Sequence, residues 1–546
     1  MSGVRNEELT IDGLDPANLT VPGLLARAVE RFGDREALVD LSVDPPVRLT
    51  YAQLADEARA TAKALIAAGV EHGDRVAIWA PNIWEWPVTL LGLHLAGAVL
   101  VPLNTRYKGS EAAFILNRSG AKVLFTVQGF LGNDYVSMLD DHDIETVERI
   151  VIIRGDVPEG ATGCAEFVAA GASVSDADLQ ARIDSVSPDD VADILFTSGT
   201  TGAPKGVMCT HRQTVLAFDA WGTIVGLRDD DRYLVINPFF HSFGYKAGII
   251  ASLVKGNALV PLATFDVGAA MSVIEAEQIT TLPGPPTIFQ TIINHPDFDI
   301  DKLSTLRLAV TGAASIPVQL IKDMRDVLKF DTVLSAYGLT EACGIATVSR
   351  HDDPPEIIAN YSGRAIPNVE VRIADDDGNE VPRGEQGEVL IRGYQVMTGY
   401  FDAPEQTAET IDADGWLHTG DVGVMNPDGY LKITDRTKDM FIVGGFNAYP
   451  AEIESLLAEH PDIAQASVVG VPDERMGEVG YAFVVLKQGA TATAGDITSW
   501  ARGHMANYKA PATVEIVDAL PLNASGKVLK FELRDRAVAA TGKAVE

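Results

Sequence analysis

The chain has little cysteine and no cysteine motif. Its 546 residues include three cysteines, Cys164, Cys209 and Cys343, which are far apart and have no Cys-x-x-Cys pattern or histidine cluster near them. A scattered and odd-numbered set excludes a disulfide framework and gives no structural metal site. We therefore expect the protein to reside in a reducing compartment.

Long uninterrupted hydrophobic runs are also missing. The longest apolar stretch, residues 86–103, is broken by two prolines, two glycines and a histidine, so it does not predict a membrane-spanning helix. The first eight residues are polar and acidic and lack the apolar core of a signal peptide. We expect a cytoplasmic enzyme with no transmembrane segment.

Positive charge is scarce. The 43 lysines and arginines face 76 aspartates and glutamates, which gives a net charge of -33. Such a chain repels nucleic acid and anionic lipid, because binding to both needs clustered basic side chains. With 47% hydrophobic and 22% charged residues the chain is globular, and its length exceeds what one core serves. At least two domains and no nucleic-acid partner are expected.

What is present is an alternation of helical and strand-like segments. Helical periodicity in residues 54–68, 86–95 and 110–118 alternates with short apolar runs at 75–80, 98–103 and 122–127. This pattern predicts a parallel, doubly wound sheet. A second series follows, with strand candidates at 232–236, 258–262, 280–282 and 306–311.

The character of the chain changes after these two series. Residues 363–433 contain short strands separated by glycine, proline and aspartate, which is typical of an antiparallel section. We therefore expect an α/β fold with a large N-terminal domain, residues 1–435, made of two doubly wound lobes and a barrel-like β section. Residues 436–546 are expected to form a small mobile α+β domain.

A phosphate-binding loop is predicted between two strand-like segments. Residues 197–206 read T-S-G-T-T-G-A-P-K-G, in which three glycines allow a close backbone approach and four hydroxyls and one ammonium can donate to phosphate. The Walker A pattern is absent, because proline precedes Lys205 and glycine follows it. Ser/Thr/Gly runs are often linkers, but strand-like residues 192–196 and 207–208 hold this one at both ends.

Three further motifs suit a nucleotide enzyme. Residues 337–341, Y-G-L-T-E, supply an aromatic ring that can stack on adenine, a hydroxyl for phosphate and a carboxylate for a hard cation. Asp421 follows a glycine turn and could accept two ribose hydroxyls, although Gly-Asp turns are common. Lys527 stands alone on a loop of small residues, where by itself it would be a surface charge.

Together and in this order, these segments resemble the adenylate-forming (ANL) superfamily of acyl-CoA synthetases, carrier-protein adenylation domains and oxidative luciferases. The resemblance extends from about Leu24 to Arg536. It implies that a carboxylate attacks the α-phosphate of ATP to give an acyl-adenylate and pyrophosphate, after which a thiol displaces AMP. The first step needs no general base, because a carboxylate is already ionised at neutral pH.

The resemblance also implies roles for individual residues. Lys527, Thr340 and a magnesium ion on Glu341 and Thr197 would stabilise charge at the α-phosphate, with ATP and coenzyme A as co-substrates. His241 would be a gate beside the substrate carboxylate rather than a proton carrier. The implied ATP-binding residues are Thr197, Ser198, Gly199, Thr200, Thr201, Gly202, Lys205, Gly312, Ala313, Ala314, Tyr337, Gly338, Thr340, Asp421, Arg436 and Lys527.

In the family the small domain rotates after adenylation. The hinge position corresponds to Lys438, and Gly444 and Gly445 would line the coenzyme A tunnel. His241, Phe243 and Tyr245 would line the acyl pocket. Amino-acid adenylation domains carry an aspartate where His241 stands, so an α-amino acid is disfavoured. No carrier-protein domain is evident, which favours free coenzyme A as the thiol.

The acyl substrate is the most open question. Residues 236–253, 434–454 and 505–509 are similar to actinobacterial ligases of steroid catabolism, which activate a bicyclic propanoate called HIP. HIP is the favoured carboxylic acid; a medium- or long-chain fatty acid is the main alternative and an aryl acid the third. Three alternatives belong to other functional classes: a stand-alone adenylation enzyme that loads a carrier protein, a luciferase-type oxidase and a P-loop NTPase. A homo-oligomer is left open, as is contact of Arg475 or Lys509 with the coenzyme phosphate.

Overall fold

The computed structural model describes residues 10–542 apart from 198–203, 313–315, 317, 376, 437–439, 449, 488, 522–527 and 529. The chain forms two compact units. The larger unit ends at Thr434, and the smaller unit comprises the chain from Asp435 onward together with Arg106–Ala112 and Thr197–Lys205. Each unit has its own sheets and its own apolar clusters.

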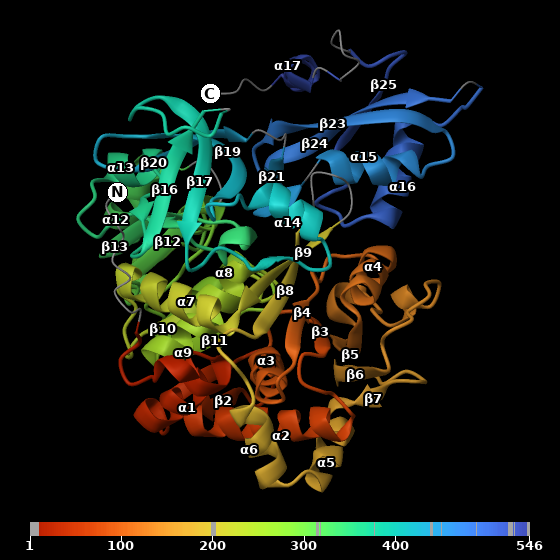
Figure 1. The fold of residues 1–546 in the computed structure, drawn as a ribbon. Coiled ribbons are helices and arrows are strands. Elements are labelled where there is room, and N and C mark those ends of the chain that lie inside the picture. Colours follow the sequence, from red (N-terminus) through yellow and green to blue (C-terminus); the bar gives the residue numbers. More distant parts are fainter. Residues whose placement is uncertain are drawn as a thin grey trace. The chain divides into compact units, whose positions relative to one another are not determined.

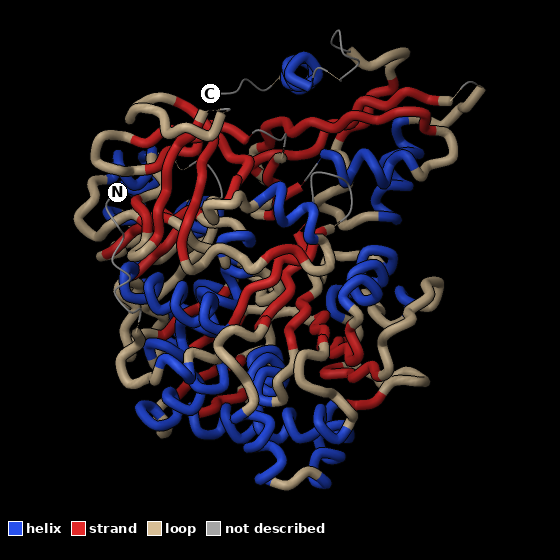
Figure 2. Tube along the Cα trace, viewed as in Figure 1, coloured by secondary structure: helices blue, strands red, loops and turns tan. Residues whose placement is uncertain are grey.

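An eight-stranded sheet in the larger unit confirms the first doubly wound series (Figure 1). Its order is β18 (Gly399–Tyr400), β9 (Lys205–Thr210), β8 (Val191–Thr197), β4 (Val99–Pro102), β3 (Arg75–Trp79), β5 (Ala121–Val127), β6 (Arg149–Arg154) and β7 (Thr162–Gly163). Strands β3 to β8 pair in parallel with their neighbours, and every residue of β4 is buried. Such strands belong to a sheet covered on both faces, and helices flank the strands in Figure 2.

The second series forms another largely parallel sheet. Strands β10 (Arg232–Val235), β11 (Ala258–Pro261), β1 (Glu36–Asp40) and β2 (Val47–Thr50) are adjacent in that order. Strands β12 (Leu308–Gly312), β13 (Thr332–Tyr337), β14 (Thr347–Val348) and β15 (Arg364–Ala365) form the other half. Thr281 joins the halves, because it bridges Tyr233 of β10 and Leu308 of β12 in parallel.

The helices of the larger unit begin and end at residues suited to those positions. The side-chain oxygens of Thr50 and Thr210 accept from the third backbone N–H of α2 and α7, while Gln53 and Gln213 complete capping boxes. Gly226, with φ of 73°, ends α7 in the left-handed conformation. The helices are α1 (Val21–Phe32), α2 (Tyr51–Ala67), α3 (Glu85–Leu95), α4 (Gly109–Ser119), α5 (Cys164–Ala170), α6 (Asp176–Asp184), α7 (His211–Val225), α8 (Ser242–Gly244), the π-helix η5 (Tyr245–Ile250), α9 (Ala251–Lys255), α10 (Val267–Glu277), α11 (Pro286–Ile293), α12 (Val318–Asp326), α13 (Pro355–Asn360) and α14 (Pro404–Thr410).

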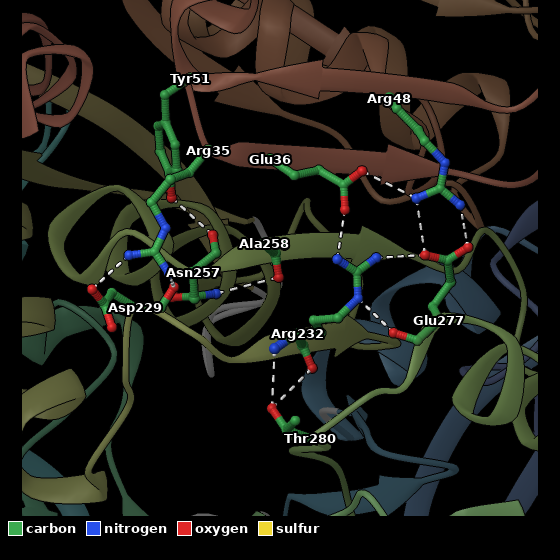
Figure 3. Close-up of polar contacts among 10 residues, drawn as sticks. All are labelled: Arg35, Glu36, Arg48, Tyr51, Asp229, Arg232, Asn257, Ala258, Glu277 and Thr280. Carbon is green, nitrogen blue, oxygen red and sulfur yellow. Dashed lines mark hydrogen bonds and ion pairs between the residues drawn. The ribbon is translucent and has the colours of Figure 1, made fainter. Parts of the chain in front are cut away.

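Alternating charges hold the second sheet against helix α10 (Figure 3). Arg232 lies 2.5 Å from Glu36 of β1 and also pairs with Glu277 at the end of α10. Arg48 of β2 joins the same two carboxylates, at 3.1 Å from Glu36 and 2.5 Å from Glu277. Because each carboxylate meets two guanidinium groups, these half-buried charges are mutually compensated.

The section expected to be antiparallel and barrel-like forms a four-stranded sheet. Its order is β16 (Val369–Ala374), β17 (Gln386–Gly393), β19 (Leu417–Met425) and β20 (Leu431–Arg436). The pairs β16–β17 and β17–β19 are antiparallel. Strand β19 carries Asp421, so this sheet positions one of the predicted site residues.

The smaller unit contains a five-stranded sheet with helices on both faces. The strands are β21 (Phe441–Val443), β22 (Phe446–Ala448), β23 (Ile463–Asp473), β24 (Gly477–Leu486) and β25 (Thr513–Ile516). One apolar cluster includes Val468 with side chains of α15 (Pro450–Ala458) and α16 (Ala494–His504). A second includes the next residue, Val469, with side chains of α17 (Lys530–Thr541). Neighbouring strand residues thus face opposite cores, and the expected α+β fold is confirmed.

No helix in the described parts of the chain is both long and apolar enough to cross a membrane. This includes α3, whose residues fall in the longest apolar stretch of the sequence and are nearly all buried in the larger unit.

Two buried histidines lie between helices of the larger unit. His94 of α3 and His211 of α7 have ring centroids 4.9 Å apart, and His211 Nδ1 accepts a hydrogen bond from the backbone of Val21 at 3.3 Å. Burial disfavours the imidazolium form and lowers the pKa of His94 to about 3. The folded protein therefore keeps His94 neutral where the unfolded chain would bind a proton.

We predict that this histidine weakens the fold on acidification. Between pH 6.5 and 3 the unfolded chain binds the extra proton, so stability falls as pH is lowered through that window. At pH 5 the loss due to His94 should be about 2 kcal/mol. Urea unfolding at pH 7 and pH 5 should show that the free energy of unfolding falls less for His94→Leu than for the wild type. Equal falls for both proteins would contradict the prediction.

Candidate active site

The ends of two parallel strands bring the predicted adenine-binding residues together. Gly312 ends β12, and its register partner in β13 is Ala336, the residue before Tyr337. A Cβ atom at Gly312 would lie 2.8 Å from the carbonyl oxygen of Ala336, so a side chain there would crowd the neighbouring strand. Carboxyl ends of parallel strands are where ligands bind in open α/β sheets. Ala313 and Ala314 lie outside the described residues.

Tyr337 and Asp421 meet although they are far apart in the sequence. The Tyr337 hydroxyl donates a hydrogen bond of 2.5 Å to Asp421 Oδ2. Asp421 is 3% exposed and follows Gly420, whose φ is 69° and whose backbone N–H donates to Glu388 at 3.0 Å. The aromatic ring predicted for adenine and the carboxylate predicted for ribose are therefore neighbours.

The turn after Tyr337 is closely packed around two glycines. A Cβ atom at Gly338 would lie 2.3 Å from the carbonyl oxygen of Gly344, so only glycine fits there. Between them, Thr340–Ala342 forms a 3₁₀ turn and Cys343 follows with a left-handed φ of 57°. Thr340 and Glu341 are partly exposed at this turn. The Thr340 hydroxyl and the Glu341 carboxylate therefore lie on the same short turn.

The carboxylate of Glu341 is held by residues that sequence reasoning missed. Its Oε1 accepts from the Tyr400 hydroxyl at 3.0 Å, and its backbone oxygen accepts from Met397 N–H at 2.8 Å. Tyr400 in β18 pairs with Val207 of β9, the strand that follows the predicted phosphate loop. Only strand pairing brings Tyr400 to Glu341, so no local pattern in the sequence could have identified it.

The strands predicted to flank the phosphate loop are present. Thr197 is the last residue of β8, and Lys205 is the first residue of β9. The loop residues Ser198, Gly199, Thr200, Thr201 and Gly202 lie outside the described residues, as do Lys438 and Lys527. Arg436 is the last residue of β20.

The segment predicted to line the acyl pocket forms the short helix α8, which begins with an N-cap at His241. His241 caps α8, and its Nδ1 accepts from the backbone N–H of Phe243 at 3.1 Å. The His241 ring has an exposed surface, yet the surrounding protein removes enough water to lower its pKa to about 4. The ring is therefore neutral at pH 7 with Nδ1 engaged by the backbone, and its gating role stays a prediction. Phe243 is partly exposed, whereas Tyr245 is wholly buried.

In the smaller unit, Gly444 and Gly445 form the turn between β21 and β22. Both have positive φ, 57° and 85°, and the Gly444 N–H donates to Met476 at 2.7 Å. Lys509 is not a surface charge, because it is 2% exposed and lies 2.7 Å from Glu452; its contact with the coenzyme phosphate stays a prediction. Buried lysines of this kind are paired structural charges.

A magnesium site of the expected kind would use few protein ligands. Within the described ranges, no three histidine, cysteine, aspartate or glutamate side chains gather in a group that could hold a metal. Mg²⁺ in nucleotide enzymes is bound by one or two carboxylates together with phosphate oxygens and water. The oriented carboxylate of Glu341 fits that donor set.

Comparison with known proteins identifies the family. The family model described as AMP-binding enzyme matches residues 25–401, and the AMP-binding enzyme C-terminal domain matches residues 452–527. Two relatives named 3-[(3aS,4S,7aS)-7a-methyl-1,5-dioxo-octahydro-1H-inden-4-yl]propanoyl:CoA ligase, from Rhodococcus jostii and Mycobacterium tuberculosis, are 50% identical over 94% of this chain and 98% of their own. The solved o-succinylbenzoate CoA synthetase of Bacillus subtilis is 27% identical with a TM-score of 0.77, covering 95% of this chain and 98% of that one.

The chain therefore belongs to the AMP-binding enzyme family, the adenylate-forming superfamily that its motifs resemble. Within that family it is an acyl-CoA ligase, an acid–thiol ligase that uses ATP and coenzyme A.

We predict that Gly338→Ala disrupts the turn that carries Thr340 and Glu341. The new Cβ atom would overlap the Gly344 carbonyl oxygen, so the turn must shift. Pyrophosphate exchange should fall by about 100-fold, because small displacements of reacting groups have effects of this order. Gly503→Ala is the matched control, since a Cβ atom there meets nothing within 4 Å. Similar exchange rates for the two variants would contradict the account of this turn.

Proposed function

We propose that the protein is an ATP-dependent carboxylate–CoA ligase whose acid is the steroid-derived bicyclic propanoate HIP. The observation that carries this proposal is the 50% identity, over 94% of the chain, to two ligases named for that acyl group. The hydrogen bond between Tyr337 and Asp421, and the orientation of Glu341 by Tyr400 on the turn that follows Tyr337, support the nucleotide half of the reaction.

In the first half-reaction the substrate carboxylate attacks the α-phosphate of ATP, and pyrophosphate leaves. Tyr337 stacks on adenine above Gly312, Ala313 and Ala314, while Asp421 and Arg436 hold the ribose. Tyr337 fixes the orientation of Asp421, whose carboxylate oxygens can each accept more than one hydrogen bond. The β- and γ-phosphates lie on the loop of Thr197, Ser198, Gly199, Thr200, Thr201, Gly202 and Lys205.

Two anions meet in this step, so charge neutralisation is the main requirement. Lys527 and Thr340 donate to the α-phosphate as negative charge builds on its oxygens. Glu341, oriented by Tyr400, and Thr197 hold Mg²⁺. When bound, the ion neutralises phosphate charge and aligns the leaving group.

In the second half-reaction the coenzyme A thiol attacks the acyl-adenylate and AMP leaves. We propose that residues 436–546 turn about Lys438 relative to residues 1–435. This movement withdraws Lys527 and presents Gly444 and Gly445 along the thiol tunnel. The positive φ of both glycines allows a close backbone approach to the thiol arm.

The acyl pocket is proposed to lie beside α8. His241 is neutral above about pH 4 and sits at the start of that helix turn, where a gate beside the carboxylate is needed. Phe243 and Tyr245 supply apolar surface for a bicyclic acid. We also propose a cytoplasmic location, where ATP and coenzyme A are available; assembly as a homo-oligomer remains a prediction.

The substrate proposal is tested with a panel of acids. HIP, straight-chain acids of medium and long length, and benzoates are assayed for AMP release with free coenzyme A. We expect the highest kcat/KM for HIP, because a rigid bicyclic acid loses less conformational freedom on binding than a straight-chain acid does. A higher kcat/KM for straight-chain acids would make the protein a fatty-acid ligase. AMP release that requires a phosphopantetheinyl protein would make it a carrier-protein loading enzyme.

The mechanism is tested at Lys527. Lys527→Ala should lower pyrophosphate exchange by about 100-fold or more, because a donor to the developing charge is removed. Thiolysis of supplied acyl-adenylate should change far less, since the lysine is withdrawn by then. Lys487→Ala, at an exposed lysine of the same domain, is the control. Equal losses in both half-reactions would overturn the role assigned to Lys527.

A further inference from the structure

A buried ion pair lies beneath the site in the larger unit. The ammonium of Lys246, in the π-helix η5, is 3.0 Å from Asp193 Oδ2 on β8, and the two side chains are 1% and 0% exposed. Burial raises the pKa of Asp193 and by itself would lower that of Lys246, but Asp193 together with the neighbouring Cys209, Cys343 and Tyr245 raises the pKa of Lys246. A buried ammonium needs a counter-charge, and the Asp193 carboxylate lies where it can supply one.

The pair is connected to a thiol. Lys246 Nζ also donates to Cys343 Sγ at 3.3 Å, and the Thr214 hydroxyl lies 3.4 Å from Asp193 Oδ2 and 3.7 Å from the same sulfur. The sulfur is completely buried and lies within reach of both the Lys246 ammonium and the Thr214 hydroxyl.

Three residues of this cluster, Asp193, Lys246 and Cys343, each belong to a segment that also carries a predicted site residue. Asp193 precedes Thr197 on β8. Lys246 follows His241 through α8. Cys343 directly follows the turn of Thr340 and Glu341. A change at Lys246 is thus transmitted to each of these segments through a direct contact.

The turn at Cys343 needs such support. Cys343 holds a left-handed φ of 57°, which is unfavourable for a residue with a side chain, and its side chain is completely buried. The sulfur contact with Lys246 fixes the side chain of the residue that reverses the chain. The Tyr400 hydroxyl donates a hydrogen bond to the Glu341 carboxylate, whereas the buried Lys246 ammonium donates one to the sulfur at the end of the turn.

We propose that Lys246 is a positioning residue for adenylate formation: its ammonium, anchored by Asp193, fixes the turn at Cys343 and so aims the Glu341 carboxylate at the metal. This proposal rests on the proposed function in one respect, namely that Glu341 binds Mg²⁺. Lys246 itself touches neither ATP nor the acid. The competing explanation is that Lys246 only neutralises a buried Asp193.

A double variant separates these explanations. Lys246→Met alone leaves an unpaired buried carboxylate, so both thermal stability and pyrophosphate exchange should fall. In Asp193→Asn/Lys246→Met no buried charge remains, and the thermal unfolding temperature should recover. Exchange should nevertheless stay about 10- to 100-fold below wild type, with a raised Mg²⁺ concentration for half-maximal rate.

Lys255→Met is the matched control. Lys255 also forms an ion pair, at 2.8 Å with Asp219, but it joins α9 to α7 away from the turn of Thr340 and Glu341. Its replacement should leave the exchange rate and its Mg²⁺ dependence unchanged. If the double variant regains wild-type exchange and Mg²⁺ dependence, Lys246 merely neutralises Asp193 and the proposal is overturned.

A third variant keeps the test decisive if the first two fail to fold. Cys343→Ala leaves the ion pair intact and removes the contacts of the sulfur with Lys246 and Thr214. It should raise the Mg²⁺ concentration for half-maximal exchange, and an unchanged value would refute the positioning role. Glu341→Gln tests the underlying function separately. If that change leaves Mg²⁺ dependence unaltered, the metal role of Glu341 fails, whatever Lys246 does.

Discussion

The site depends on one constraint, the parallel pairing of β12 with β13. Parallel strands end at the same edge of a sheet, so Gly312 at the end of β12 and the turn after Tyr337 occur at that edge. Neither Gly312 nor Gly338 has room for a larger residue, because the backbone of the neighbouring strand or turn lies too close. The groups proposed to bind the nucleotide therefore stand on backbone that has few other conformations available to it.

The second requirement is that side chains from distant parts of the chain meet at this edge. Asp421 comes from the antiparallel sheet and Tyr400 from the edge of the eight-stranded sheet, and each forms a hydrogen bond with a residue of the turn or strand end. These bonds link three sheets around one group of polar side chains.

Much of the architecture could be predicted from the sequence, since helix and strand periodicities are local properties. The strand predictions at 75–80, 232–236 and 258–262 each agree with an observed strand to within about one or two residues. Contacts across sheets could not be predicted in this way. Tyr400 reaches Glu341 only because β18 pairs with β9, and the insertion of β1 beside β11 is likewise a property of the whole fold. The contact of the Tyr245 hydroxyl with the buried Asp193, at 3.5 Å, likewise joins segments that are distant in the sequence and could not be predicted.

The small C-terminal sheet has a separate apolar core on each face. Both apolar cores are therefore built from residues that follow Thr434. Substitutions on the surface of this unit can accumulate while the two cores, and with them its fold, are preserved. Selection on the thiol step proposed for this unit can then act on one part of the gene with little effect on the part proposed to select the acid.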